Sequence, residues 1–397
     1  MIETNRQKNK KPRSSHILYP SLHVIKFMKS LRHPKSIIIW LFLAIGLFSC
    51  PEDPCDGCVD DVIPGDYNPT AYGFQFPEWL PEFEVPSDNP MTVEGIALGR
   101  KLFYETDLSG DRNISCASCH QLENSFSDNI PFSLAGNGQM TSRGAMALVN
   151  LGFNESNLLW DGGVQTLEEQ VLQAVEDPLM LDGDWIDVLD RLTIDGEYQQ
   201  MFRAAFGVER KSEISKDHVA KAIAQFERTL VSYNSRYDQV VWENDGWFTN
   251  EEERGRALFF KEDDQQVEHP GCSHCHIAKY FTDHSFRNNG IDGPPSLSDF
   301  EDPGRGGVTG VYFDNGKFRV PTLRNIEVTA PYMHDGRFET LEEVLDHYSA
   351  GGHDLENEDP NIRPFTLTET QKQDMISFLK TLTDTVFLNK TDFKNPF

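Results

Sequence analysis

The chain has 397 residues, of which 36 are Lys or Arg and 63 are Asp or Glu, so its formal net charge is −27 at pH 7. A surface this acidic repels nucleic-acid phosphates and anionic lipids, which argues against a nucleic-acid-binding function. The length is sufficient for two domains of ordinary size.

Residues 1–49 are predicted to be a signal segment that is removed on export. Residues 1–35 hold nine Lys or Arg and one acid, and an apolar run of twelve residues, Ile37 to Phe48, follows them. Such a run is too short to span a bilayer but matches the hydrophobic region of a signal peptide. The sequence Leu-Phe-Ser-Cys then ends at Cys50, which is typical of a bacterial lipoprotein signal; a plain secretory signal is the alternative. We therefore expect a periplasmic protein that contacts the membrane only through a lipid on Cys50.

Residues 50–90 are predicted to form a tether, because they are rich in Pro and acidic residues and poor in aliphatic ones. This segment contains Cys55 and Cys58, a CxxC pair that no His follows. In an exported protein such a pair is most simply a small disulfide or an exposed dithiol. From Thr92 onward, apolar residues recur near helical spacing, which predicts a helix that leads into the next motif.

Two copies of a CxxCH motif follow, Cys116-Ala-Ser-Cys119-His120 and Cys272-Ser-His-Cys275-His276. The motif is typical of the attachment site of a c-type haem, because each Cys adds to one haem vinyl group and the adjacent imidazole ligates the iron. A redox CxxC needs no adjacent His, and a zinc site needs four clustered ligands. The sequence therefore predicts two covalently bound c-type haems.

Helical signals dominate the rest of the chain. A Thr followed three residues later by Glu or Gln precedes four apolar-periodic runs, at Thr166, Thr249, Thr340 and Thr368, as in helix capping boxes. Residues 216–233 form a longer amphipathic pattern. The clearest β signal covers residues 311–320, where Asn-Gly favours a tight hairpin turn. We expect an all-α fold with one small β-hairpin.

A domain boundary is predicted at the Asn-Asp-Gly sequence of residues 244–246, between two predicted helices. It gives an N-terminal domain over residues 91–245 and a C-terminal domain over residues 246–397, each with one CxxCH motif. The predicted hairpin belongs to the second domain. Haem supplies apolar surface from inside, so a small helical domain can close around it without a large protein core.

The order of the motifs resembles that of the bacterial di-haem cytochrome c peroxidases, including the MauG-like branch. The resemblance rests on both CxxCH motifs and on segments 98–104, 159–162, 167–170, 321–325, 329–336 and 340–352. It implies two fused cytochrome c-like domains, each enclosing one covalent haem. The N-terminal haem is implied to be peroxidatic and the C-terminal haem to transfer electrons. The implied activity is that of an exported oxidoreductase with hydrogen peroxide as electron acceptor.

The resemblance also implies roles for residues of the first domain. Trp160 matches a tryptophan that lies between the haems and couples them electronically, although core packing is the commoner fate of a Trp. Gln170 matches a residue that can hydrogen-bond a distal ligand. Met180 stands where the family has an acid–base glutamate. Either a carboxylate such as Glu176 replaces it, or peroxide cleavage is weaker; Glu176 as a solvated acid at a helix end is an equal alternative.

The axial position opposite each proximal His determines what the iron can do. An iron closed by His or Met transfers electrons, whereas an open iron can bind peroxide. No His occurs between His120 and His218, so the first haem, on His120, is expected to be five-coordinate. At the second haem, on His276, the resemblance places Tyr348 where typical members carry a ligating Met and the MauG-like branch carries Tyr. Met333 is the fallback ligand.

The family also binds a calcium ion between its domains through carbonyl oxygens. Thr329 and Pro331 match two of these positions, while Gly144 stands where an Asn usually helps. The resemblance therefore predicts a bound calcium ion, although one of the expected ligands is missing.

The leading hypothesis is a peroxidase that receives electrons from a small cytochrome or copper protein. An alternative is MauG-like oxidation of side chains on a partner protein, which Tyr348 and an open first haem favour. An alternative of another class is a non-catalytic di-haem electron carrier, in which both irons are six-coordinate and low-spin.

Overall fold

The computed structural model describes residues 61–154, 156–261 and 270–397. The predicted signal segment, the predicted lipidation site Cys50, the pair Cys55 and Cys58 and the first part of the predicted tether lie outside these residues. Within the described part of the chain, no helix is both long enough and apolar enough to cross a membrane.

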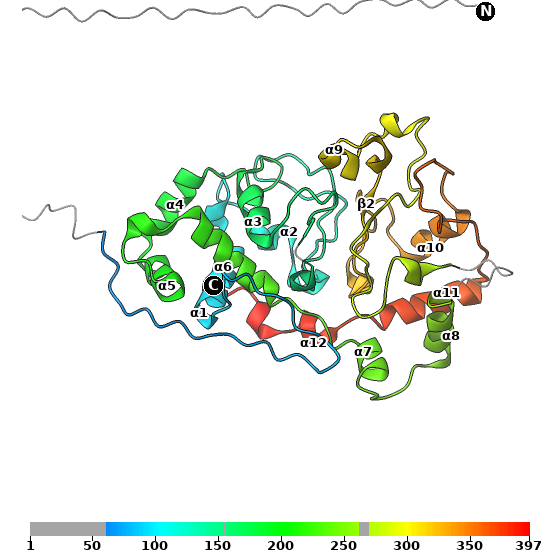
Figure 1. Ribbon diagram of the computed structural model, residues 1–397, viewed down its shortest axis with the longest axis horizontal. Helices are drawn as coiled ribbons and strands as arrows, with labels where there is room; N and C mark the ends of the chain where they lie inside the picture. Colours follow the sequence, from blue (N-terminus) through cyan, green and yellow to red (C-terminus); the bar gives the residue numbers. More distant parts are fainter. Residues whose placement is uncertain (1–60, 155, 262–269) are drawn as a thin grey trace, which may run out of the picture. The chain divides into compact units, whose positions relative to one another are not determined.

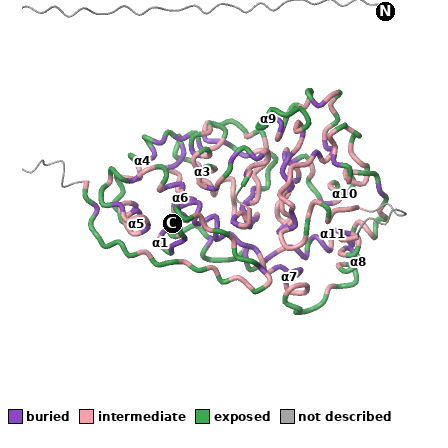
Figure 2. Tube along the Cα trace, in the orientation of Figure 1, coloured by how far each residue is buried: buried purple, intermediate pink, exposed green. Residues whose placement is uncertain are grey.

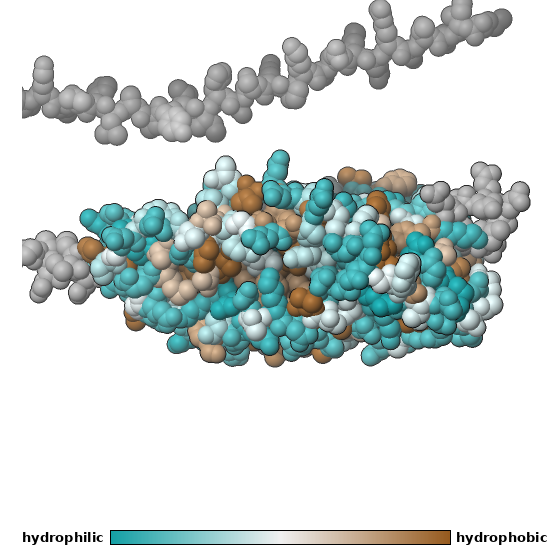
Figure 3. All heavy atoms as spheres, turned by 90° about the horizontal axis from the view of Figure 1, so that it is seen from below, coloured by the Kyte–Doolittle hydropathy of each residue, from teal (hydrophilic) through white to brown (hydrophobic). Residues whose placement is uncertain are grey.

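Helices joined by long loops make up most of the described chain (Figure 1). The α-helices are α1 Val93–Phe103, α2 Cys116–Cys119, α3 Leu167–Glu176, α4 Trp185–Ile194, α5 Gly196–Phe206, α6 Lys216–Arg228, α7 Arg236–Val241, α8 Asn250–Phe259, α9 Arg305–Thr309, α10 Leu341–Ala350, α11 Glu369–Lys380 and α12 Thr385–Leu388. The strands are β1 Phe286–Arg287 and β2 Phe318–Arg319. Buried and exposed positions alternate along the helices (Figure 2). The surface seen in Figure 3 is largely hydrophilic, as the 25% of charged residues predicts.

Threonine caps begin five of the described helices: Thr92 caps α1, and the other four are at predicted helix starts. The hydroxyls of Thr166, Thr249, Thr340 and Thr368 each accept a hydrogen bond from the backbone N–H three residues later. Each bond satisfies an N–H that has no partner inside its helix. The helix starts predicted at these residues, for α3, α8, α10 and α11, are confirmed.

The helix predicted over residues 216–233 ends earlier, because α6 stops at Arg228. Beyond this point the backbone finds tertiary partners. The Asn150 side chain donates to the Ser232 carbonyl oxygen at 3.1 Å and accepts from the Ser232 N–H at 2.8 Å. These bonds take the place of helical ones, so the backbone polar groups stay paired outside the helix.

A first hydrophobic core forms where α1 packs on α6. Its buried side chains include Leu98, Leu102 and Phe226. Gly99 lies at the contact, where an added Cβ would overlap the Ala222 carbonyl oxygen. Only a residue without a Cβ permits the two helices to approach this closely.

Replacing Gly99 by Ala is expected to lower the free energy of unfolding by about 1–3 kcal/mol, because α1 must move away from α6. Gly196 is the matched control, since its Cβ position has no neighbouring atom within 4 Å. The same change there should alter stability by about 0.5 kcal/mol or less. Urea unfolding of the haem-loaded protein measures both, and equal effects would contradict the close helix contact.

A second hydrophobic core lies in the C-terminal half, where α8 packs against α11. Its buried side chains include Phe259, Phe281 and Phe378. The end of the chain then returns to the first half, because Phe387 and Phe393 are buried in the first core. The domain limits expected from the sequence stay a prediction.

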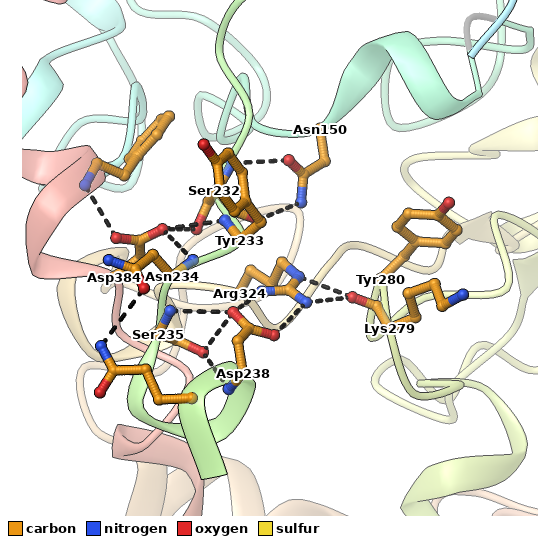
Figure 4. Close-up of polar contacts among 12 residues, drawn as sticks. Asn150, Ser232, Tyr233, Asn234, Ser235, Asp238, Lys279, Tyr280, Arg324 and Asp384 are labelled. Atoms are coloured by element: carbon orange, nitrogen blue, oxygen red, sulfur yellow. Dashed lines mark hydrogen bonds and ion pairs between the residues drawn. The ribbon is translucent and has the colours of Figure 1, made fainter. Parts of the chain in front are cut away.

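A buried polar network fixes the segment between α6 and α7 (Figure 4). The Asp384 carboxylate accepts hydrogen bonds from the Ser232 hydroxyl at 3.2 Å and from the N–H groups of Tyr233 and Asn234 at 3.0 and 2.8 Å. The Asp384 N–H itself donates to the Asn325 side chain at 2.7 Å. The chain that connects the two cores is therefore held by side chains from the C-terminal half.

The prediction of a hairpin over residues 311–320 is wrong, although the second half does hold a small antiparallel sheet. The sheet pairs β1 with β2, which are far apart in the sequence. Asn315 has a φ of −62°, whereas the tight hairpin turn that Asn-Gly favours needs a positive φ. The Asn315 side-chain amide instead donates to the Leu297 carbonyl oxygen at 3.0 Å. A tertiary contact has therefore overridden the local turn preference.

Candidate haem-binding sites

The first CxxCH motif consists of α2 and His120, the residue that ends it. Cys116 and Cys119 are free thiols, so both can form thioether bonds. The His120 Nδ1 atom lies 2.7 Å from the Phe126 carbonyl oxygen. Because a carbonyl only accepts, Nδ1 carries the proton, which leaves the Nε2 lone pair for a metal ion.

The second motif repeats this geometry. Cys272 and Cys275 are also free thiols, and the His276 Nδ1 atom lies 3.0 Å from the Phe281 carbonyl oxygen. Burial lowers the pKa of both His120 and His276, which favours the neutral imidazole that ligates a metal. Two separate sites thus present the same donors, two thiols and one oriented imidazole.

A cavity lined mainly by the C-terminal half, and also by residues of the first half, opens onto the second motif. Cys272, Cys275 and His276 belong to its wall. Apolar side chains contribute to the rest of the lining, including Phe259, Leu341, Leu345, Met375 and Leu379. A c-type haem needs the thiols and the imidazole, and apolar lining suits the faces of its porphyrin. The residues present therefore fit a covalently bound haem.

Two predicted sixth ligands, Tyr348 and Met333, meet at one point of this cavity. The Asn289 side-chain nitrogen donates to the Tyr348 hydroxyl oxygen at 3.3 Å and lies 3.4 Å from Met333 Sδ. Both candidates line the cavity. The neighbouring His347 has its Nε2 atom 3.1 Å from the Asn289 carbonyl oxygen, so that ring nitrogen is already engaged.

The protonation state of Tyr348 depends on what lies beside it. Burial raises the pKa of its hydroxyl to about 12, with a smaller opposing effect of the Asn289 hydrogen bond. The side chain is therefore a neutral phenol unless a cation is adjacent. A ferric iron would supply that charge and favour the phenolate.

Replacing Tyr348 by Phe is expected to change the absorption and electron paramagnetic resonance spectra of the second haem and to leave those of the first unchanged. The oxygen ligand is lost, while the ring keeps its volume. Met333→Leu, at the same point of the cavity, is the matched control and should leave both haems unaltered. An altered Met333→Leu spectrum beside an unaltered Tyr348→Phe spectrum would assign the thioether as ligand instead.

Trp160 lines the same cavity from the first half of the chain. Its indole N–H donates to the Gly144 carbonyl oxygen at 2.8 Å. Its own carbonyl oxygen accepts from the Arg319 N–H, also at 2.8 Å. Both halves therefore hold Trp160 in place, which suits a bridge between two haems.

Arg143, which the sequence did not single out, secures the loop that carries Trp160. Its guanidinium donates two hydrogen bonds to Asp302, at 2.7 and 2.8 Å, and one to Asp161 at 2.6 Å. Burial alone would lower the pKa of Arg143, but the two carboxylates raise it instead. These ion pairs join the two halves of the chain next to Trp160. In the sequence, only Asp161 beside Trp160 pointed to an ion pair at this loop, and it did not show that Arg143 is the partner.

Two residues were expected at the distal side of the first haem, and the position of only one of them, Gln170, favours that role. Gln170, on α3, has a buried Oε1 atom with no hydrogen-bond partner among the described residues. The next residue, Val171, belongs to the core on which Cys116 packs. A buried acceptor without a partner among the described residues, such as Gln170 Oε1, suits a residue that binds a ligand. Glu176 is exposed, with its carboxylate 3.7 Å from Lys216 Nζ, which favours the solvated-acid alternative.

The predicted calcium positions, Thr329 and Pro331, line the cavity too. The Gly144 carbonyl oxygen accepts from Trp160, and the Gly144 N–H donates to the His334 carbonyl oxygen at 2.8 Å. Across residues 61–154, 156–261 and 270–397, no group of three or more His, Cys, Asp and Glu side chains could hold a metal ion. A calcium ion held by carbonyl oxygens stays a prediction.

Comparisons with known sequences show which proteins this chain is similar to. Residues 93–246 match a family model described as di-haem cytochrome c peroxidase. The methylamine utilization protein MauG of Methylorubrum extorquens is 33% identical over 314 residues, which cover 78% of this chain and 83% of the relative. The cytochrome-c peroxidase IdrP1 of Denitromonas iodatirespirans is 32% identical over 346 residues, which cover 80% of this chain and 89% of the relative.

Solved structures show the same fold. A MauG-like protein associated with microbial copper homeostasis is 35% identical with a TM-score of 0.75, and the match covers 82% of this chain and 99% of that one. The diheme peroxidase BthA from Burkholderia thailandensis is 22% identical with a TM-score of 0.63, over 76% of this chain and 88% of that one. At this lower identity, the second likeness bears on the fold alone.

Proposed function

Because the chain belongs to the family of di-haem cytochrome c peroxidases, which includes MauG-like proteins, we propose that it is a peroxidase that uses hydrogen peroxide as electron acceptor. Haems bound at the two CxxCH motifs supply the redox chemistry, in which reduction of peroxide to water consumes two electrons and two protons. The observation that supports this most is the repeated pair of thiols beside a partly buried, oriented imidazole.

The two sites differ in the groups available opposite the imidazole. For the first, no His occurs in residues 121–217, and Gln170 offers a neutral amide that can orient a ligand. For the second, Tyr348 lies in the haem cavity. We assign peroxide binding to the haem on His120 and electron storage to the haem on His276 and Tyr348. Because Met180 replaces the family's glutamate, we expect slower peroxide cleavage than in relatives that keep this carboxylate.

Oxidation of side chains on a partner protein is the second candidate function. Tyr348 in the haem cavity favours it, because a phenolate ligand stabilises oxidised iron, whereas a thioether favours reduced iron. The similarity to MauG and to the MauG-like protein associated with microbial copper homeostasis supports it as well. The arrangement of Trp160 suits both functions, since each requires electrons to pass between the two haems.

A steady-state assay with a reduced small cytochrome or copper protein as electron donor separates these functions. Continuous consumption of hydrogen peroxide supports the peroxidase. Negligible turnover, alongside rapid oxidation of the resting protein by peroxide, would indicate a dedicated protein substrate. Two six-coordinate haems that do not react with peroxide would leave only the electron carrier.

We also propose that the mature protein is a periplasmic lipoprotein, with one haem in residues 91–245 and the other in residues 246–397. The basic and apolar segments before Cys50 support the anchor. Radiolabelled palmitate should be incorporated into the protein in cells and lost in Cys50→Ser. Labelling that persists in this variant would contradict the anchor.

A further inference from the structure

Four neighbouring hydrophobic side chains are exposed in the second half. Val308, in α9, and Val311, Tyr312 and Phe313, at the 3-10 helix Tyr312–Asp314, have exposed fractions of 46%, 50%, 43% and 49%. We call these four residues the α9 patch. Single exposed hydrophobic residues are common, but a contiguous group often marks a contact surface.

Polar contacts hold the backbone of the α9 patch in place. The Asn357 side chain donates to the carbonyl oxygens of Phe313 and Asn315, at 3.1 and 2.7 Å. The Arg305 N–H, at the start of α9, donates to the Lys317 carbonyl oxygen at 2.8 Å. A fixed segment therefore presents these apolar side chains to solvent, which lowers the entropy cost of binding there.

One end of the patch contacts the loop that carries Trp160. The Arg305 guanidinium donates to the carbonyl oxygens of Asp161 and Gly162, at 3.0 and 2.7 Å. Val308 lies in the same short helix as Arg305. A molecule bound on the patch would therefore lie close to the tryptophan that couples the haems.

The other end of the patch connects to the predicted ligand of the second haem. Asn357, which holds the Phe313 carbonyl, accepts from the Asn288 side chain at 2.8 Å. The next residue, Asn289, donates to the Tyr348 hydroxyl oxygen. A short chain of hydrogen-bonded groups thus joins the patch to the haem cavity.

Acidic side chains border the patch. The Tyr312 hydroxyl donates a hydrogen bond to Glu356, which raises the pKa of Tyr312. The charge of Asp299 adds a smaller effect of the same sign. Both acids are exposed, and the whole chain carries a formal net charge of −27. The complementary surface is an apolar centre ringed by Lys or Arg.

We propose that the α9 patch is the docking surface for a basic protein with which the two haems exchange electrons. The proposal rests on the proposed function and adds the chemistry of its partner, a small protein with an exposed apolar patch inside a ring of basic residues. Apolar contact at the centre provides affinity, while the acidic border steers the approach.

Binding of a basic mitochondrial cytochrome c to the immobilised haem-loaded protein, measured by surface plasmon resonance, tests this surface. In the double variant Val311→Ser and Phe313→Ser, we expect the Kd to rise about tenfold or more, because central apolar contacts are lost. In the double variant Asp299→Lys and Glu356→Lys, the association rate should fall and depend less on salt. All four residues are substantially exposed, so the fold should be retained.

Variants on α4 provide matched controls, with the exposed Ile186 replaced by Ser and the exposed Asp187 by Lys; both should bind as the unchanged protein does. No binding by the unchanged protein, or equal Kd values for the patch and control variants, would overturn the docking surface.

Peroxide turnover with a small dye as electron donor tests the proposed function separately. Its absence in the unchanged protein counts against that function, while the binding comparison still decides about the patch. Loss of dye turnover in the patch variants would also overturn a docking role.

Discussion

Replacing Asp238 by Ala should lower the free energy of unfolding by about 3–5 kcal/mol. Arg324 donates two hydrogen bonds to the Asp238 carboxylate, at 2.7 and 2.9 Å, and both side chains have an exposed fraction of 1%. Without the carboxylate, the guanidinium would stay buried without its counter-charge. Arg324 also donates to the carbonyl oxygen of Lys279 (Figure 4), three residues after His276. The loss should therefore loosen the loop that holds the second haem.

The exposed ion pair between Arg337 and Asp292 is the matched control. It has a similar distance of 2.8 Å, but the side chains are 33% and 35% exposed. Because water screens this pair, Asp292→Ala should cost about 1 kcal/mol or less. The double variant Asp238→Leu and Arg324→Met should recover part of the loss, since no unpaired charge remains. Urea unfolding of the haem-loaded protein measures all of these, and equal losses at residues 238 and 292 would argue against a buried, essential ion pair.

In Trp160→Phe, peroxide turnover should fall by about a hundredfold, equivalent to a barrier higher by about 2.7 kcal/mol. Phe keeps most of the volume but cannot donate to the Gly144 carbonyl oxygen, and its ring is much harder to oxidise than an indole. Both haems should remain attached, because neither CxxCH motif is altered. Steady-state turnover, together with the absorption spectrum that reports haem content, measures the effect.

Trp242→Phe is the matched control for this substitution. Trp242 is also partly buried and stacks on Trp79 with ring centroids 5.4 Å apart. It is not one of the described residues that line the haem cavity. Its replacement should leave turnover within a factor of about two, a change of about 0.4 kcal/mol in the barrier. Equal turnover in Trp160→Phe and the unchanged protein would remove Trp160 as the bridge.

Local sequence patterns predicted the helices and the haem motifs because neighbours in the sequence determine them. Thr340 and Thr368, for example, cap α10 and α11 through hydrogen bonds to residues only three positions further along the sequence. In the same way, His120 and His276 find their carbonyl partners within six and five residues. No distant contact is needed to place these groups.

The features that the sequence did not reveal depend on distant contacts. Asn315 forms no hairpin turn because its side chain binds Leu297 and the following strand pairs with β1. Arg143 pairs with Asp302, which is 159 positions away. Glu176 lies on the same helix as Gln170, and only the packing of the other helices leaves its carboxylate exposed beside Lys216. Helical periodicity alone could not have distinguished these outcomes.

Electron paramagnetic resonance of the purified ferric protein tests most directly whether the two haem sites differ. A first haem without a sixth protein ligand should give a high-spin signal. A second haem held by His276 and Tyr348 should give a low-spin signal. We predict one signal of each kind in equal amounts; two low-spin signals would contradict an open first haem.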